Sequence, residues 1–130
     1  MKDNIISNKN IPTAIGPYSP VIKVGDMLFF SGQLPIKPET GNIVGEEIEK
    51  QTIQVLENLK VLLELYSFTL KNIVKTTIFL KDMNDFTKLN KIYETYFREV
   101  FPARTCVEVA CLPKNALVEI EAIAIKSKNN

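Results

Sequence analysis

A chain of 130 residues, 45% of them hydrophobic, has the length and composition of one globular domain. Its 16 basic and 15 acidic residues leave a net charge of +1, so no basic excess favours nucleic acid as a partner, and no apolar run is long enough to span a membrane. The chain has no histidine, which excludes a Ser-His-Asp triad, a Cys-His pair and nearly every catalytic zinc site. Any acid–base chemistry must come from carboxylates, Tyr, Lys, Cys or ordered water.

The N-terminal residues carry no targeting signal. Residues 1–6 lack the apolar core of a signal peptide, which predicts a cytoplasmic protein. No linker, repeat or low-complexity tract divides the chain, so we expect a single domain over residues 1–130, with residues 1–13 poorly ordered. Cys106 and Cys111 match no metal-binding or redox spacing and are predicted to be free thiols in a reducing compartment.

The N-terminal third of the chain predicts a turn and two strands. Ile15-Gly16-Pro17-Tyr18-Ser19-Pro20, with prolines on both sides of a tyrosine, predicts an ordered turn or irregular edge. Strands follow at residues 21–24 and 27–34, and Gly25-Asp26 between them suggests a hairpin. Pro38-Glu39-Thr40-Gly41 predicts a further turn, in which the glycine can take a positive φ.

The middle of the chain predicts two amphipathic helices with a strand between them. The first helix begins near Glu46 and Glu47, which suit its positive end. Its apolar face is Ile48, Thr52, Val55, Leu56, Leu59, Leu62, Leu63 and Tyr66. The β-branched run at residues 72–80 predicts a strand, and Asp82-Met83-Asn84-Asp85 offers N-caps for a second helix that ends at Pro102. The apolar face of that helix is Phe86, Leu89, Tyr93, Tyr96, Phe97 and Val100.

The last two predicted strands carry charged residues among apolar ones. In the strand at residues 101–109, Arg104, Cys106 and Glu108 lie two apart and therefore share a face. In the strand at residues 117–125, Glu119 and Glu121 share a face with apolar residues and need a partner. If these two strands pair antiparallel, Arg104 can supply that partner, either in a buried ion pair at a subunit contact or in a ligand site.

The order β-β-α-β-α-β-β predicts an α+β fold in which two helices cover one face of a five-stranded sheet. The strands at residues 27–34 and 117–125 are apolar on both faces, and no third helix covers the second face. We therefore expect oligomerisation to cover it.

The remaining candidates each have a structural alternative. Ser31-Gly32 inside an apolar strand indicates either a β-bulge or close approach of a ligand to the backbone. Tyr18 is a pocket lid or a packed aromatic, and Asn90 faces a site or solvent. Cys106 is a small buried side chain or a nucleophile, although no histidine is available to activate it.

Together these motifs resemble a known family from about Ala14 to Ile125. They are Ile15-Gly16-Pro17-Tyr18-Ser19-Pro20, Phe30-Ser31-Gly32-Gln33, Val74-Lys75-Thr76-Thr77, Met83-Asn84-Asp85-Phe86, Pro102-Ala103-Arg104-Thr105-Cys106-Val107-Glu108-Val109 and Val118-Glu119-Ile120-Glu121-Ala122-Ile123-Ala124. As a set they resemble the RidA (YjgF) family, the reactive intermediate deaminases.

The resemblance implies a chorismate-mutase-like fold with one mixed sheet, assembled as a homotrimer with sites between subunits. It also implies hydrolysis of short 2-imino acids, such as 2-iminobutanoate and 2-iminopropanoate, to 2-oxo acids and ammonia. Dehydratases that use pyridoxal phosphate release such imines from threonine or serine, which links the reaction to isoleucine metabolism. Members of the family need no metal or organic cofactor.

The resemblance also implies residue roles. Arg104 matches the arginine that binds the substrate carboxylate, and Glu119 matches the glutamate that positions the attacking water. Five positions that line the family's pocket correspond to Tyr18, Ser31, Gly32, Asn90 and Cys106. Cys111 departs from the family pattern, because many members have an arginine there, and we expect an effect on substrate range or trimer contacts.

Two other functions compete with the deaminase. One is a non-catalytic trimeric sensor that binds a 2-oxo acid at the same arginine, and the presence of both Arg104 and Glu119 argues against it. The other is an RNA-directed or chaperone role, and the net charge of +1 argues against RNA.

Overall fold

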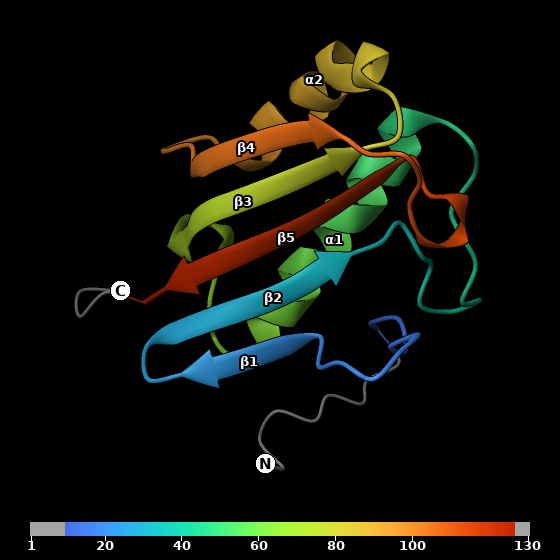
Figure 1. Cartoon of the computed structure of the whole chain (residues 1–130). Helices are drawn as coiled ribbons and strands as arrows, with labels where there is room; N and C mark the ends of the chain where they lie inside the picture. The colour runs from blue at the N-terminus through green and yellow to red at the C-terminus, as the bar shows by residue number, and fades with distance from the viewer. Residues whose placement is uncertain (1–9, 127–130) are drawn as a thin grey trace.

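A computed structural model of the chain describes residues 10–126 (Figure 1). Residues 1–13 were expected to be poorly ordered. Residues 1–9 lie outside the described residues, whereas Ile11 is 5% exposed and belongs to the core. The strands and helices are β1 (Val21–Val24), β2 (Met27–Gln33), α1 (Ile48–Leu65), β3 (Ile73–Leu80), α2 (Phe86–Tyr96), β4 (Ala103–Glu108) and β5 (Val118–Ile125). Short 3-10 turns stand at η2 (Leu70–Asn72), η3 (Met83–Asp85) and η4 (Pro113–Asn115). The predicted order of elements and the α+β class are confirmed.

The five strands form one mixed sheet in the order β1-β2-β5-β3-β4 (Figure 1). All neighbours are antiparallel except β3 and β4, which are parallel. The antiparallel pairing considered for the last two strands is therefore wrong, because β3 lies between β4 and β5. The reason is the crossover through α2, which returns β4 beside β3 in the same direction, as parallel strands require.

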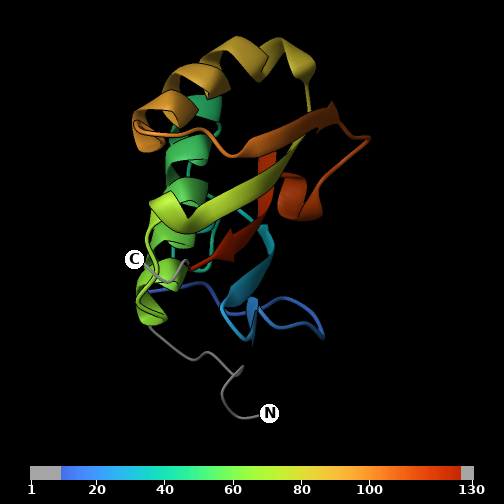
Figure 2. The ribbon, with the colours of Figure 1, turned by 90° about the vertical axis from the view of Figure 1, so that its left-hand side faces the viewer.

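Both helices lie on one side of the sheet, which we call the helix side (Figure 2). β5 contributes to it every second residue, and all of these are at most 4% exposed: Val118, Ile120, Ala122 and Ala124. They belong to the same core cluster as the fully buried stripe of α1, namely Val55, Leu56, Leu59, Leu62 and Leu63. Burial of this stripe stabilises α1, because amphipathic helices gain most of their stability from tertiary packing.

The opposite side, which we call the open side, carries neither α1 nor α2 (Figure 2). Four large apolar side chains on it are between 39% and 58% exposed: Val24, Phe29, Val107 and Ile125. Large apolar side chains exposed in this way on one face of a sheet indicate an interaction surface. The prediction that the sheet has a second apolar face without a helix to cover it is confirmed for the described residues.

The second helix is shorter than predicted. α2 ends at Tyr96, the backbone of Phe97 has left helical geometry (φ −114°, ψ 82°), and Val100 is 81% exposed instead of on an apolar helix face. Pro102 disfavours helical geometry only at Phe101, and the chain leaves the helix five residues before the proline in order to turn into β4 at Ala103.

Several predicted local features are confirmed. Gly41 has a positive φ of 74°, as predicted. Of the predicted N-caps, Asp82 caps the 3-10 turn η3 by accepting a hydrogen bond from the Asn84 amide (2.9 Å), whereas Asp85 at the start of α2 makes no side-chain capping hydrogen bond. The Glu108 carboxylate accepts a hydrogen bond from the Met83 amide (2.8 Å), which gives Glu108 a structural part. Within residues 10–126, no helix combines the length and the apolar character that crossing a membrane requires.

Asn58 fixes the segment that follows β2 onto α1, and this yields a first prediction. Its amide, 1% exposed, donates to the carbonyls of Leu34 (3.1 Å) and Ile36 (3.0 Å). Asn58→Ala leaves both carbonyls without this donor, so we expect the free energy of unfolding to fall by about 2–4 kcal/mol. Chemical denaturation measures it. Gln54→Ala, which removes only the Gln54–Asn58 hydrogen bond (2.9 Å), is the control and should cost about 1 kcal/mol or less. Equal losses in the two variants would refute this assignment.

Candidate functional site

The first group of predicted site residues lies at the outer edge of the sheet, between β4 and α2. Arg104 pairs in register with Thr76, and Cys106 with Ile78, so both side chains point to the helix side. An Arg104 Nη1 hydrogen donates to Oδ1 of Asn90 on α2 (2.8 Å). We call Asn90, Arg104 and Cys106 the arginine cluster.

The Cys106 thiol is not activated as a nucleophile. Burial raises its pKa, and the nearby Arg104 guanidinium only partly opposes this effect. A raised pKa keeps the thiol protonated at neutral pH, whereas a nucleophilic cysteine requires the thiolate. Cys106 and Cys111 are free, as predicted. Cys106 therefore contributes a small, uncharged side chain to the arginine cluster.

The second group surrounds an irregularity in β2. The register between β2 and β5 shifts between Phe30 and Gln33, which confirms the bulge predicted at Ser31-Gly32. The Glu119 carboxylate lies directly against Gly32, where an added Cβ would collide with Oε1, Cδ and Cγ of Glu119. The absence of a side chain at Gly32 leaves room for this close approach of Glu119.

Ser31 and Tyr18 complete the second group. The Ser31 hydroxyl donates to the Ser19 carbonyl (2.6 Å), which ties the predicted turn to the bulge. Tyr18 is 44% exposed and, with Gly32, lines a cavity of about 30 Å³. Such a cavity has room for one or two water molecules. We call Tyr18, Ser31, Gly32 and Glu119 the glutamate cluster.

Glu119 is the titratable group of this cluster. Burial raises its pKa, and the like charge of Glu121 on the same face raises it further. A carboxylate with a raised pKa is a stronger base than an exposed one, and it is suited to accept a proton from water.

The two clusters lie on opposite sides of the sheet of one chain. Glu119 pairs with Phe79 on the open side, whereas Arg104 pairs with Thr76 on the helix side, and β3 separates their strands. Within residues 10–126, Arg104 forms no ion pair with a carboxylate. The ion pair that the sequence suggested between Arg104 and Glu119 or Glu121 therefore does not form inside one chain.

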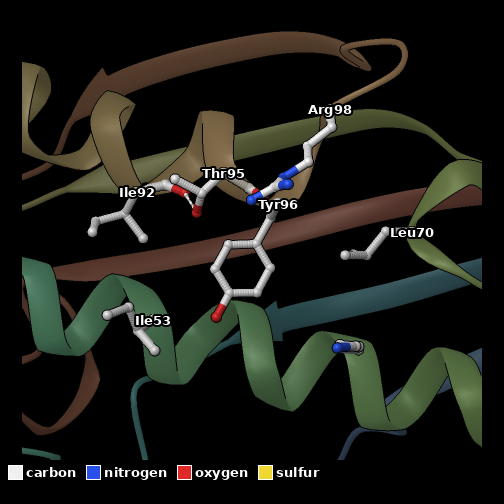
Figure 3. A pocket seen from close by; sticks show the side chains of 7 residues that line it. Ile53, Leu70, Ile92, Thr95, Tyr96 and Arg98 are labelled. Carbon is white, nitrogen blue, oxygen red and sulfur yellow. Dashed lines mark hydrogen bonds between the residues drawn. The ribbon is translucent and has the colours of Figure 1, made fainter.

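A separate groove of about 420 Å³ lies between the outer surfaces of α1 and α2 (Figure 3). Tyr96 reaches from α2 toward α1, where its hydroxyl donates to the Glu57 carboxylate (2.6 Å), and Arg98 donates to the Thr95 carbonyl (3.2 Å). None of the predicted site residues lines this groove, so it is distinct from both clusters. In the part of the chain that the structure describes, no three His, Cys, Asp or Glu side chains gather in a way that could hold a metal ion.

Phe86 and Tyr93 lie beside the arginine cluster, although the sequence predicted them only as part of the apolar face of the second helix. The Arg104 guanidinium carbon lies 5.4 Å from the ring centroid of Phe86 and 5.0 Å from that of Tyr93. Their spacing from Asn90 was the available signal, because residues 86, 90 and 93 share one face of a helix.

The chain is similar to known proteins over nearly its whole length. Residues 8–126 match the family described as Endoribonuclease L-PSP. The chain is 54% identical to a RutC family protein of Pyrococcus horikoshii, over 94% of this chain and 97% of the relative. It is 48% identical to a protein of Salmonella typhimurium named 2-iminobutanoate/2-iminopropanoate deaminase, over 93% and 96% of the two chains. The crystal structure of TdcF from E. coli with bound serine superimposes with a TM-score of 0.89 at 41% identity, over 95% of this chain and 98% of the other.

The contact between Gly32 and Glu119 yields a second prediction. In Gly32→Ala, the methyl group displaces the flexible Glu119 side chain toward solvent, so the pKa of Glu119 falls toward the ordinary value of 4.5. We expect the free energy of unfolding to change by about 1 kcal/mol or less, because the end of a side chain can rotate away. A carbon-13 NMR titration of the carboxyl group measures the pKa. Ser31→Ala, which leaves Gly32 intact, is the control. An unchanged Glu119 pKa in Gly32→Ala would count against the contact.

Proposed function

Because the chain belongs to the RidA (YjgF, L-PSP) family, we propose that it is a 2-iminobutanoate/2-iminopropanoate deaminase. The observation that carries this proposal is an arginine that no carboxylate of the described residues neutralises, together with a partly buried glutamate of raised pKa. A relative that is 48% identical has this enzyme name, which supports the same reaction here. The free thiols of Cys106 and Cys111 favour a reducing compartment, and we place the reaction in the cytoplasm.

The site of this enzyme is composite and forms between copies of the chain. Since Arg104 and Glu119 face opposite sides of one sheet, a single substrate can contact both only if they come from different subunits. In a closed homotrimer, each subunit offers its arginine cluster to one neighbour and its glutamate cluster to the other. The exposed apolar residues of the open side, such as Phe29 and Ile125, support this assembly because they need cover.

The chemistry follows from the two clusters. The Arg104 guanidinium binds the carboxylate of the 2-imino acid through two parallel hydrogen bonds and fixes its C=N carbon beside the partner subunit's glutamate cluster. Glu119 orients a water molecule and accepts its proton as the oxygen adds to that carbon. That proton passes to the nitrogen and gives a carbinolamine. Glu119 then moves the proton of the new hydroxyl group to the amine, the C=O bond forms as the C–N bond breaks, and ammonia and the 2-oxo acid leave. Such imines also hydrolyse unaided, so a modest lowering of the barrier is sufficient.

A trimeric sensor that binds 2-oxo acids is the alternative. Binding alone needs Arg104, whereas Glu119 on the open side has no part in holding a carboxylate, since two anions repel each other. TdcF, crystallised with serine, extends the range of small ligands to amino acids, and we expect the arginine cluster to bind the carboxylate of such ligands. Turnover therefore separates the enzyme from the sensor.

The coupled reaction with a threonine dehydratase yields a third prediction. We expect this protein to accelerate the release of 2-oxobutanoate while a trapping amine competes for the imine. Glu119→Gln should lower kcat about 100-fold or to the uncatalysed rate, and should keep binding 2-oxobutanoate, because only the proton acceptor is lost. Arg104→Ala should weaken that binding about 100-fold. No acceleration over buffer by the wild-type protein would sink the deaminase proposal. Equal loss of binding and turnover in Glu119→Gln would make Glu119 structural.

Subunit complementation yields a fourth prediction, which tests the composite site. At a substrate concentration near the wild-type KM, Arg104→Ala should show little activity alone because it binds substrate weakly, and Glu119→Gln because it lacks the proton acceptor. A mixed trimer contains interfaces at which an intact Arg104 meets an intact Glu119. Random mixing in equal amounts should restore about a quarter of the wild-type activity. Co-expression of both variants and the coupled assay measure it. Arg104→Ala mixed with the double variant is the control and should stay inactive. No recovery in mixed trimers of verified composition would exclude a site shared between subunits.

A further inference from the structure

Three residues on one face of α2 contact Arg104. Phe86, Asn90 and Tyr93 stand at positions i, i+4 and i+7 of the helix, so their side chains lie in one row. Each contacts the same guanidinium: the Phe86 ring at 5.4 Å, the Asn90 carbonyl oxygen at 2.8 Å and the Tyr93 ring at 5.0 Å. Three contacts from a rigid element restrict a side chain that is otherwise flexible.

The Tyr93 side chain is itself held in place by its neighbours. Tyr93 is 3% exposed, and its hydroxyl shares a buried hydrogen bond with the Thr76 hydroxyl (2.8 Å). Thr76 is the β3 residue in register with Arg104, so the bond joins the helix to the strand at the level of the arginine. The Phe97 ring packs against Tyr93 from the other side, with centroids 4.6 Å apart. The aromatic surface beside Arg104 is therefore preformed.

These contacts leave hydrogen-bonding capacity on the guanidinium. Rings attract the cation through their π-faces within about 6 Å, which consumes none of its N–H groups. Asn90 accepts one N–H, and a guanidinium has five in a planar fork. Within residues 10–126 no carboxylate pairs with Arg104, so the protein fixes the cation without neutralising it. This arrangement fits an incoming planar carboxylate.

We propose that Phe86 and Tyr93 are positioning residues that hold the Arg104 guanidinium ready for the substrate carboxylate. The identity of that carboxylate, a 2-imino acid, rests on the proposed function. Since Arg104 binds the carboxylate equally in the ground state and in the transition state, the aromatic contacts set KM and leave kcat nearly unchanged.

The test compares aromatic and aliphatic side chains at residue 86, which is only half-buried and tolerates exchange. Phe86→Leu keeps the apolar packing and removes the π-face, so KM for the imino acid and Kd for 2-oxobutanoate should rise roughly threefold to thirtyfold. The value of kcat should stay within about twofold. Phe86→Tyr restores the π-face and should bring KM back toward the wild-type value. Phe68→Leu is the matched control, because it removes a ring that lies 5.2 Å from the Lys126 ammonium and is not one of the rings beside Arg104, so KM should stay unchanged.

A second readout does not depend on enzyme activity. In a Cys111→Ser background Cys106 is the one thiol of the chain, and the Arg104 guanidinium lowers its pKa against the effect of burial. If Phe86→Leu frees the guanidinium, the pKa of Cys106 rises, which the pH profile of its alkylation rate measures.

The two readouts separate the two proposals. A rise of both KM and the Cys106 pKa in Phe86→Leu supports the positioning role. Unchanged KM and unchanged pKa overturn it while the deaminase stands. A wild-type protein without turnover, in which Phe86→Leu still raises the Cys106 pKa, overturns the deaminase and keeps the positioning role.

Discussion

The period of two along a β-strand governs the layout of this protein. In β5, Val118 and Ile120 enter the core, so Glu119 between them must face the open side. In β4, Arg104 pairs with the buried Thr76 and must face the helices. Neither side chain can change sides unless its strand shifts by one residue, which would move the whole apolar set out of the core. The hydrophobic core therefore fixes both chemical groups and keeps them apart within one chain.

Burial acts on the ionisable groups of the two clusters in different ways. It raises the pKa of both Glu119 and Cys106, but Glu119 has a like charge beside it and Cys106 has a guanidinium. The carboxylate becomes a better base, and the thiol stays protonated and inert. Arg104 contacts two aromatic rings and an amide oxygen, and no carboxylate of the described residues neutralises its charge. The local environment thus gives Glu119, Cys106 and Arg104 different chemical properties, which the sequence pattern does not show.

Much of the fold followed from pattern, and the exceptions have physical causes. The helical stripe of α1 and the alternation in β5 predict their elements, since each pattern leaves one face to bury. The end of α2 was missed because the apolar spacing continues through Phe97 to Val100, while the chain leaves helical geometry at Phe97 to turn into β4. The position of β4 was missed because pairing between strands depends on the crossover and not on the composition of either strand.

The sequence by itself determined on which face of each strand the candidate site residues lie. Arg104 with Cys106, and Glu119 with its apolar neighbours, were predicted correctly at this level because strand alternation is a local property. Only the tertiary structure decided that β3 separates the two strands, that α2 brings Phe86 and Tyr93 to Arg104, and that Glu119 lies on Gly32. Those contacts join segments distant in the chain, and their geometry follows from how the sheet and helices pack, which no local pattern contains.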